Sequence, residues 1–212
     1  MSPRQYRAGQ RQAAAEQTRT RILEAACELL TGEKGPASFS MDAVAKTAGV
    51  ARMTVYYQFD SKTGLLEALF DDLALRGGMA GMPAAFMQPS GREALSALLD
   101  VLTGFYGSGR IALRRLRGLG ILDPELDSAL QNRGERRRGG LQVVLGRLLA
   151  DRGAELGEAE LGELVELLFM LTSFETFDSL AGPDGDTGAT ARRIEELILA
   201  VLDRRLAGPA AG

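Results

Sequence analysis

Apolar side chains recur along the chain with the period of an α-helix. Ile22, Ala25, Ala26, Leu29 and Leu30 follow the i, i+3, i+4, i+7, i+8 spacing of an amphipathic helix, expected over residues 16–31. Glycines at 32 and 35 and a proline at 36 end this helix. Because no segment alternates apolar and polar residues as a strand does, the pattern predicts an all-α fold.

Local signals place about nine helices. Ser40 is a good N-cap for a short second helix, and Asp42 lies in its first turn, where the helix dipole favours an anion. Asp123-Pro124 is a strong start signal for a later helix. Residues 76–91, rich in Gly, Pro and Met, are expected to form a flexible connector. The helices are expected at residues 16–31, 41–47, 51–57, from 60 to about 75, 92–107, 110–119, 124–151, 158–181 and 187–206.

Composition narrows the class of protein. The 212 residues are 45% hydrophobic and 25% charged, as in an ordinary globular protein, and no apolar run approaches the roughly 18 residues of a membrane span. The N-terminus lacks the apolar core of a secretory signal, so a cytoplasmic protein is expected. A single cysteine, Cys27, and the absence of histidine argue against a zinc site and remove the commonest general base. No catalytic residue, metal or cofactor is therefore expected.

Charge is distributed unevenly. Residues 1–62 carry nine Lys/Arg and six Asp/Glu, which gives 9 − 6 = +3, whereas the remaining residues carry 16 and 22, which gives −6. A basic end on an acidic body indicates a partner with negative charge at that end, although a chance imbalance would look the same.

Hydrogen-bonding side chains gather on the expected third helix. Val55 and Phe59, four positions apart, should face the core. The remaining positions then face outward or flank the core: Arg52, Met53, Thr54, Tyr56, Tyr57 and Gln58. Three short helices with a glycine turn form a helix-turn-helix unit, whose third helix enters the DNA major groove. Thr, Tyr and Lys62 suit phosphate oxygens, while Arg52 and Gln58 have donors that read bases. The alternative is a solvated helix with a tyrosine pair packed on the core.

The stretch FSMDAVAKTAGVARMTVYYQFDSKTGLLEAL resembles the DNA-binding segment of TetR-type transcriptional regulators. The hallmark of that family is a Gly-Val turn, then Thr-x-Tyr-x-x-Phe, then a Lys that opens the fourth helix. The matching residues here are Gly49-Val50, Thr54, Tyr56, Phe59 and Lys62, within a resemblance that spans about residues 18–69. Two positions depart from the pattern. Ala51 stands where Ser is usual, and Met53, often Gly, adds apolar reach toward a thymine methyl.

The resemblance implies a homodimer that binds a palindromic double-stranded operator and responds to a small-molecule effector. It implies a DNA-binding set of Ser40, Ala51, Arg52, Met53, Thr54, Tyr56, Tyr57, Gln58 and Lys62. We expect a flexible basic arm at 1–15, a DNA-binding domain at 16–75, a regulatory and dimerisation domain at 76–207 and a disordered tail at 208–212. Arg4, Arg7 and Arg11 of the arm could follow a minor groove or the backbone, or belong to a tail without a role.

The helix expected at 158–181 is apolar almost all round and therefore needs cover on both sides. One side can pack on its own domain and the other on a second copy, in the four-helix bundle that the family forms. The expected interface residues are Leu167, Met170, Phe174, Phe177, Ile194, Leu197, Ile198 and Val201.

Arg133 and Arg137 fall on the apolar face of the helix at 124–151, so an acidic partner is expected, with Glu175 as a candidate. The arginines could instead snorkel to solvent, form a structural ion pair or hold a ligand carboxylate. The expected ligand-lining residues are Phe105, Tyr106, Leu116, Arg133, Arg137, Phe169 and Glu175, for which plain core packing is the alternative.

The resulting hypothesis is a dimeric transcriptional repressor that its effector releases from DNA. Two alternatives stay open. One is a helical enzyme, although its candidate glycine-rich stretch, GFYGSG, lacks the Lys-Ser/Thr of a phosphate loop. The other is a helical sensor that has lost DNA binding.

Overall fold

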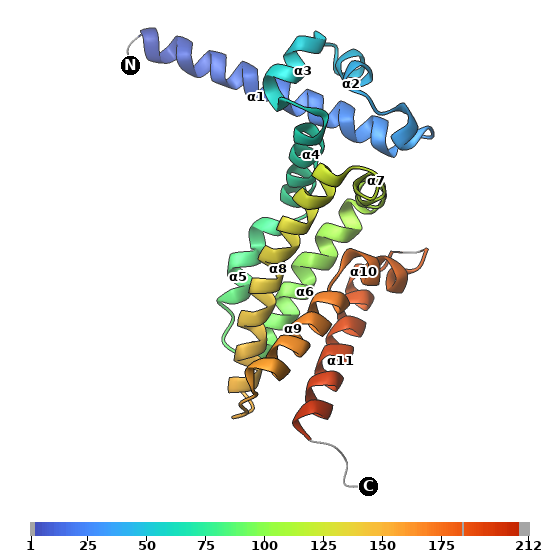
Figure 1. Ribbon diagram of the computed structural model, residues 1–212. Coiled ribbons are helices and arrows are strands. Elements are labelled where there is room, and N and C mark those ends of the chain that lie inside the picture. Colours follow the sequence, from blue (N-terminus) through green and yellow to red (C-terminus); the bar gives the residue numbers. More distant parts are fainter. Residues whose placement is uncertain (1–2, 184, 208–212) are drawn as a thin grey trace. The chain divides into compact units, whose positions relative to one another are not determined.

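The computed structural model describes residues 3–183 and 185–207, and of residues 3–8 and 11 the backbone alone. In that part of the chain it contains eleven α-helices, two short 3-10 segments and no strand (Figure 1), which confirms the all-α fold. Contacts divide the chain into two compact units. The first comprises Met1–Asp72 and Ile111–Leu130, and the second Leu73–Arg110 and Gln131–Gly212.

The first unit is built around a long helix. It contains α1 (Pro3–Thr31), the 3-10 segment η1 (Gly35–Ser38), α2 (Met41–Ala48), α3 (Arg52–Phe59), the first part of α4 (Lys62–Arg76), most of α7 (Arg110–Gly120) and the start of α8 (Pro124–Ala150). Helices α2 and α3 lie on one side of α1 (Figure 1). The core of the first unit is filled by fully buried apolar side chains: Ile22, Ala26, Leu30, Val44, Val55, Leu65, Leu66 and Leu69. The expected helix-turn-helix unit is present.

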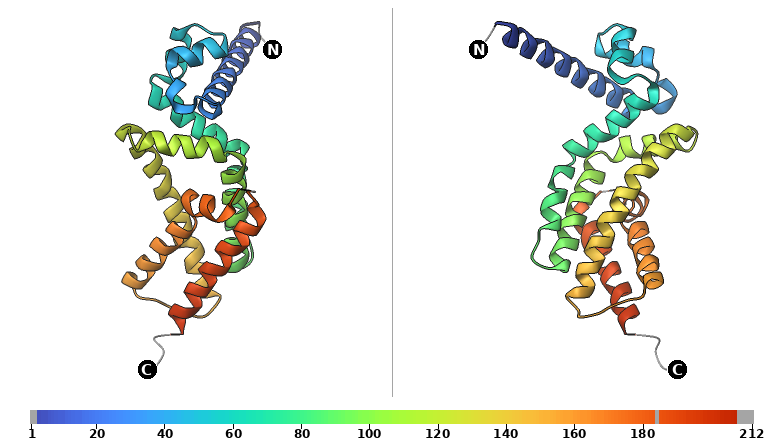
Figure 2. Two further views of the ribbon diagram at one scale, coloured as in Figure 1. Left: turned by 90° about the vertical axis from the view of Figure 1, so that its right-hand side faces the viewer. Right: turned by 60° about the vertical axis from the view of Figure 1, so that its left-hand side comes forward.

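The second unit is a helical bundle. It contains the rest of α4 and α8, the 3-10 segment η2 (Met79–Gly81), α5 (Met82–Phe86), α6 (Gly91–Ser108), α9 (Glu158–Leu171), α10 (Phe174–Ala181) and α11 (Thr187–Leu206). Helix α11 runs alongside α6 (Figure 2). The core of the second unit is apolar and contains the fully buried side chains of Leu95, Leu145, Leu148, Phe177 and Ile198.

The first helix is longer than expected. It begins at Pro3 rather than at residue 16, so the segment expected as a flexible arm is helical from that point. Ala, Gln, Arg and Glu dominate residues 8–17, and all are strong helix formers, while a proline is well tolerated in the first turn. The side chains of Arg4, Arg7 and Arg11 are outside the described part of the chain, as is the expected tail at 208–212.

Two further differences account for eleven α-helices in place of about nine. Part of the expected connector forms α5, which Pro83 helps to start. The single helix expected at 158–181 is two helices, because Ser173 has extended backbone and caps α10 by accepting a hydrogen bond from the Thr176 N–H (3.1 Å).

Residues 111–130 pack with the first unit, although they fall inside the regulatory domain expected at 76–207. The division into functional domains stays a prediction. Among the described helices, none is both long and apolar enough to cross a membrane.

Candidate nucleic-acid interface

Local signals fix both the start of α2 and the turn between α2 and α3, which consists of Gly49, Val50 and Ala51. The Ser40 hydroxyl caps α2 by accepting from the Ala43 N–H (3.1 Å). Gly49 ends the helix with φ of 64°, in the left-handed region that favours glycine, and the Val50 N–H then bonds the Ala45 carbonyl (3.0 Å). Ala51 begins α3 without a side-chain cap. Residues 49–51 therefore separate the two helices, and the start of α3 lies at the surface.

The two faces of α3 differ sharply. Val55 and Phe59 are buried at 0% and 4% exposure, whereas Met53 is 73% and Tyr57 86% exposed. Arg52 and Lys62 are also exposed, and Thr54, Tyr56 and Gln58 are half-buried. Since apolar burial holds the inner face, the large apolar and aromatic side chains of the outer face do not serve this unit's core.

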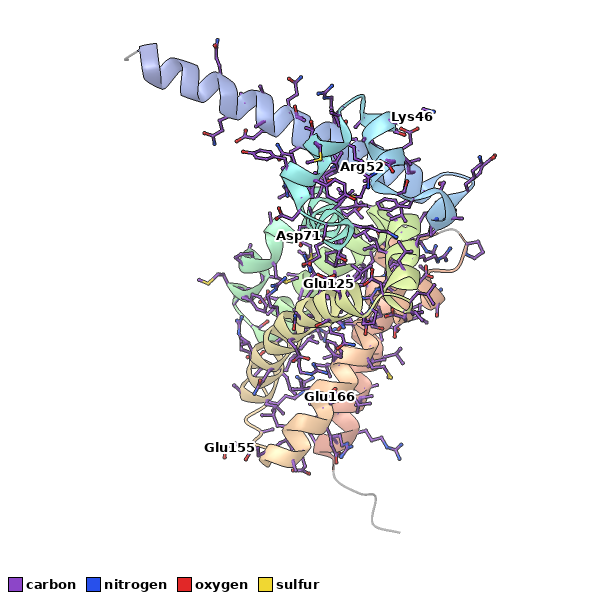
Figure 3. All side chains as sticks on the ribbon, turned by 45° about the horizontal axis from the view of Figure 1, so that its top comes forward. Lys46, Arg52, Asp71, Glu125, Glu155 and Glu166 are labelled. Atoms are coloured by element: carbon purple, nitrogen blue, oxygen red, sulfur yellow. The ribbon has the colours of Figure 1, made fainter. Side chains whose placement is uncertain are left out.

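Arg52 is held by two neighbours. Its Nε lies 3.1 Å from Asp42 Oδ1 in an ion pair, its Nη2 donates to the Tyr56 hydroxyl (3.3 Å), and its guanidinium lies 5.4 Å from the Tyr56 ring centroid. Arg52 is labelled on the ribbon in Figure 3. The Tyr56 hydroxyl, and then the charge of Asp42, hold the pKa of Arg52 above its usual value. The guanidinium is thus charged and oriented at the exposed start of α3.

A tight junction places Lys62. Asp60 has φ of 59° and ψ of −47°, and the Ser61 N–H bonds the Phe59 carbonyl across it (2.6 Å). Ser61 Oγ then accepts from the Gly64 N–H (3.0 Å) and caps α4. A Cβ at Gly64 would lie 2.3 Å from the Phe59 carbonyl oxygen, so only glycine fits there. Lys62 opens α4 with its ammonium 5.9 Å from the Phe39 ring centroid, at a helix N-terminus.

Three further contacts hold the frame of the first unit, by which we mean the helices that position α3. None of these contacts was predicted from the sequence. Arg19 donates to the Gln58 carbonyl (3.2 Å) and stacks on Phe59. Arg115 of α7 donates to the carbonyls of Leu30 (2.5 Å) and Gly32 (2.6 Å) at the end of α1.

The third contact joins the N-termini of α4 and α8, where Thr63 donates to Glu125 (3.2 Å). The partners in these contacts are 39 to 85 positions apart, so no local pattern could have revealed them.

The expected dimer residues separate into two groups. Phe174, Phe177, Ile194 and Ile198 are 0–3% exposed and belong to the core of the second unit in a single chain. That burial corrects their assignment to a surface. Met170 and Leu197 are 54% and 44% exposed, and Leu167 and Val201 are half-buried. The interface prediction therefore rests on the second group: Leu167, Met170, Leu197 and Val201.

The expected ligand-lining aromatic residues form a buried cluster. Phe105 and Tyr106 are 3% and 5% exposed, and the Tyr106 ring lies 5.4–5.6 Å from the rings of Phe105, Phe174 and Phe177. The Tyr106 hydroxyl donates to the Thr172 carbonyl (3.1 Å). Leu116 is buried in the first unit, so it does not belong to this cluster.

Arg137 of α8 contacts the end of α9. Arg137 donates to the Phe169 carbonyl (2.9 Å) and the Thr172 hydroxyl (2.7 Å), and its guanidinium lies 4.0 Å from the Phe169 ring centroid. Arg133 is half-buried.

Glu175 is exposed in the first turn of α10. Because the break at Ser173 starts a new helix, Glu175 does not lie on the helix that Arg137 contacts, and its pairing with the arginines stays a prediction. Arg138 pairs with Glu135 and with Glu166 (2.8 Å), and this guanidinium holds the pKa of Glu166 below its usual value.

Known proteins share both the local motif and the fold. Residues 22–69 match the model of bacterial regulatory proteins of the tetR family. The HTH-type transcriptional regulator SrpR of Pseudomonas putida is 40% identical over 57 residues, 27% of this chain and 26% of SrpR. The match thus spans about a quarter of that relative's length.

Two solved structures share the fold. A TetR-like transcriptional regulator from Rhodococcus sp. RHA1 is 23% identical with a TM-score of 0.61, over 91% of this chain and 97% of that one. The transcriptional regulator FadR from Bacillus subtilis, in complex with stearoyl-CoA, is 19% identical with a TM-score of 0.65, over 84% of this chain and 96% of FadR. The matched segment 22–69 contains the turn, the buried positions and the exposed face of α3 described above. The chain belongs to the TetR family of bacterial regulatory proteins.

Proposed function

We propose that this protein is a sequence-specific DNA-binding transcriptional regulator, a repressor that binds a palindromic operator as a homodimer in the cytoplasm. The observation that carries the proposal is the contrast across α3, between buried Val55 and Phe59 and exposed Met53 and Tyr57. A short helix held rigidly on one face and presenting aromatic, apolar and cationic groups on the other suits the major groove.

Each exposed group has a role in this proposal. Lys62, at the N-terminus of α4, and the hydroxyls of Thr54 and Tyr56 meet phosphates. Met53 and Tyr57, one turn apart, make apolar contacts with base edges, while Arg52 and Gln58 donate to base acceptors. The excess positive charge of residues 1–62 supports the salt-dependent part of the affinity.

A two-fold dimer would present two copies of α3 to half-sites about one helical turn apart. Met170 of α9 and Leu197 of α11 support this arrangement, because large apolar side chains at 54% and 44% exposure are candidates for burial against a partner. Leu167 and Val201 extend the same proposed surface.

A small-molecule effector in the second unit would release the protein from DNA. The B. subtilis neighbour with this fold was solved in complex with stearoyl-CoA, which supports a ligand-binding role for the fold. Phe105, Tyr106, Phe169 and Arg137 are the proposed lining residues. Release then requires the effector to bind the DNA-incompetent conformation more tightly than the competent one.

A mobility-shift titration tests the proposal. The probe is duplex DNA from beside the protein's own gene, with unrelated duplex as competitor and at several salt concentrations. We expect a complex of two chains per duplex that outlasts the competitor and weakens as salt rises. A dimer that binds no duplex selectively would support a sensor without DNA binding, and turnover of a substrate would support an enzyme.

The roles of single residues are tested on the same probe. Lys62→Gln should weaken binding to every sequence, since it removes a phosphate contact, whereas Gln58→Ala should change the preferred sequence. Lys34→Gln is the matched control, because Lys34 is exposed and lies outside the proposed interface. The opposite pattern for Lys62 and Gln58 would contradict the assignments.

A further inference from the structure

We infer that Asp42 is a positioning residue for base recognition, which holds Arg52 so that its guanidinium reads a guanine in each half-site. The inference rests on the proposed function and goes beyond it, because it names one amino acid pair, one base and the groove edge through which they meet. It is carried by the contacts of Arg52 with Asp42 and Tyr56.

The geometry leaves the reading edge of Arg52 available. A guanidinium carries five N–H donors, of which one Nη2 donor is directed to Tyr56, while Asp42 Oδ1 lies 3.1 Å from Nε as an ion pair. Two donors on Nη1 and one on Nη2 remain at the two terminal nitrogens. An arginine reads guanine with one N–H from each terminal nitrogen, directed at O6 and N7. The ion pair and the one internal hydrogen bond therefore orient the side chain without occupying the pair of donors that recognition needs.

The position of the pair also fits. Arg52 is the first residue of α3, and the N-terminal residues of such a helix are those that contact base edges. Asp42 lies in the first turn of α2, where the helix dipole favours its charge, so the carboxylate is itself anchored. The Tyr56 ring, one turn along α3, lies 5.4 Å from the guanidinium and gives it a second neighbour.

The charge of Asp42 is the reason to assign it a role. A carboxylate near DNA repels phosphates and lowers affinity for every sequence, so it is unfavourable unless it improves selection. By neutralising Arg52 locally, Asp42 also makes that arginine a weak phosphate ligand. What remains favourable is the directed bond to an uncharged base edge.

The pair contributes little to the fold. The side chains of Arg52 and Asp42 are 58% and 64% exposed, and exposed ion pairs add little stability. Variants at either position should therefore fold, and a change in DNA binding can be assigned to recognition. Glu33→Gln removes the same charge from an exposed position of the same unit and is the matched control.

Selection from a pool of randomised duplexes, followed by titration of the enriched duplex and of copies with each G·C pair replaced, tests the inference. We expect wild type to require guanine at one position of each half-site, and Arg52→Ala to lose that requirement. Asp42→Asn should lower the preference for that guanine about tenfold. The double variant should be no worse than Arg52→Ala, because the two residues act as one unit.

A general gain in DNA affinity on replacing Asp42, without a change in the preferred sequence, overturns the inference. If Asp42→Asn, like Glu33→Gln, tightens binding to all duplexes and leaves the preferred sequence unchanged, Asp42 acts through repulsion alone. An enriched sequence without an Arg52-dependent guanine also overturns it and leaves the proposed function intact. If wild type enriches no sequence, the proposed function and this inference fail together.

Discussion

The exposed face of α3 and the aromatic cluster of the second unit place similar side chains in opposite environments. Met53 and Tyr57 are 73% and 86% exposed on a helix whose other face is buried. Phe105 and Tyr106 are 3% and 5% exposed, and the Tyr106 hydroxyl is bound to the Thr172 carbonyl. In the first case, the frame and the outward side chains are different residues. In the second, the candidate site and the core are the same residues.

This difference determines what substitutions can reveal. Outward side chains of α3 can be changed without loss of packing, so their effects report recognition. Any change in the aromatic cluster alters packing as well as a proposed ligand surface, so stability and function change together. Substitutions at four positions test this difference, and we give them in order of decreasing expected effect.

The largest effect is expected from Phe177→Ala. The Phe177 ring is fully buried and lies 5.5 Å from the Tyr106 ring, so its removal leaves a cavity in the second unit. We expect a loss of about 3–5 kcal/mol in the free energy of unfolding, measured by urea denaturation. Met87→Ala, at an 83% exposed position of the same unit, should change it little. A loss below about 1 kcal/mol for Phe177→Ala would show that this cluster is not core.

Gly64→Ala tests the frame beneath the exposed face. The new Cβ would lie 2.3 Å from the Phe59 carbonyl oxygen, so the junction between α3 and α4 must shift, at a cost of about 1–3 kcal/mol. Gly118→Ala, in a helix of the same unit with nothing within 4 Å of its Cβ, should instead stabilise by about 0.5–1 kcal/mol. Equal effects in thermal unfolding would mean that the close approach does not constrain the frame.

Arg115→Gln tests the contact between α7 and the end of α1. It removes two hydrogen bonds from a charged donor to the Leu30 and Gly32 carbonyls, and partial exposure reduces the expected loss to about 1 kcal/mol. Arg21→Gln, exposed on α1, is the control. Faster hydrogen exchange of amides near the end of α1 should accompany the loss, and unchanged exchange would argue against the contact.

The smallest effect concerns the Arg138–Glu166 pair at the surface of the second unit. Arg138 lowers the pKa of Glu166 below its ordinary value of 4.5, so the pair stabilises the folded state above pH 4.5 and loses this contribution as the pH falls through the lowered pKa. Glu166→Gln should therefore reduce stability slightly at pH 7, and the reduction should shrink as the pH falls toward 3.

The control for this pair is Glu196→Gln, at an exposed position of α11. A difference between wild type and Glu166→Gln that stays the same from pH 7 to pH 3 would show that the pair is not its source.

The sequence predicts the helix-turn-helix well because its signals are local. The Ser40 cap, the Gly49 turn and the Val55–Phe59 spacing place α2 and α3 to within about two residues of the expected ranges. The break at Ser173 was missed because apolar residues continue through it and mask the cap. Asp42, which pairs with Arg52, and the partners of Arg115 and Glu125 come from other helices, so only the folded chain brings them together.

The most direct test of the account is a fluorescence-anisotropy titration of wild type and Tyr57→Ala against two duplexes, the preferred sequence and a shuffled copy. The account predicts that wild type prefers the first duplex. Tyr57→Ala should lose about tenfold of that preference, and its free energy of unfolding should not change. Equal binding of both duplexes by wild type, or a full preference retained by Tyr57→Ala, would contradict the claim that the exposed face of α3 reads DNA.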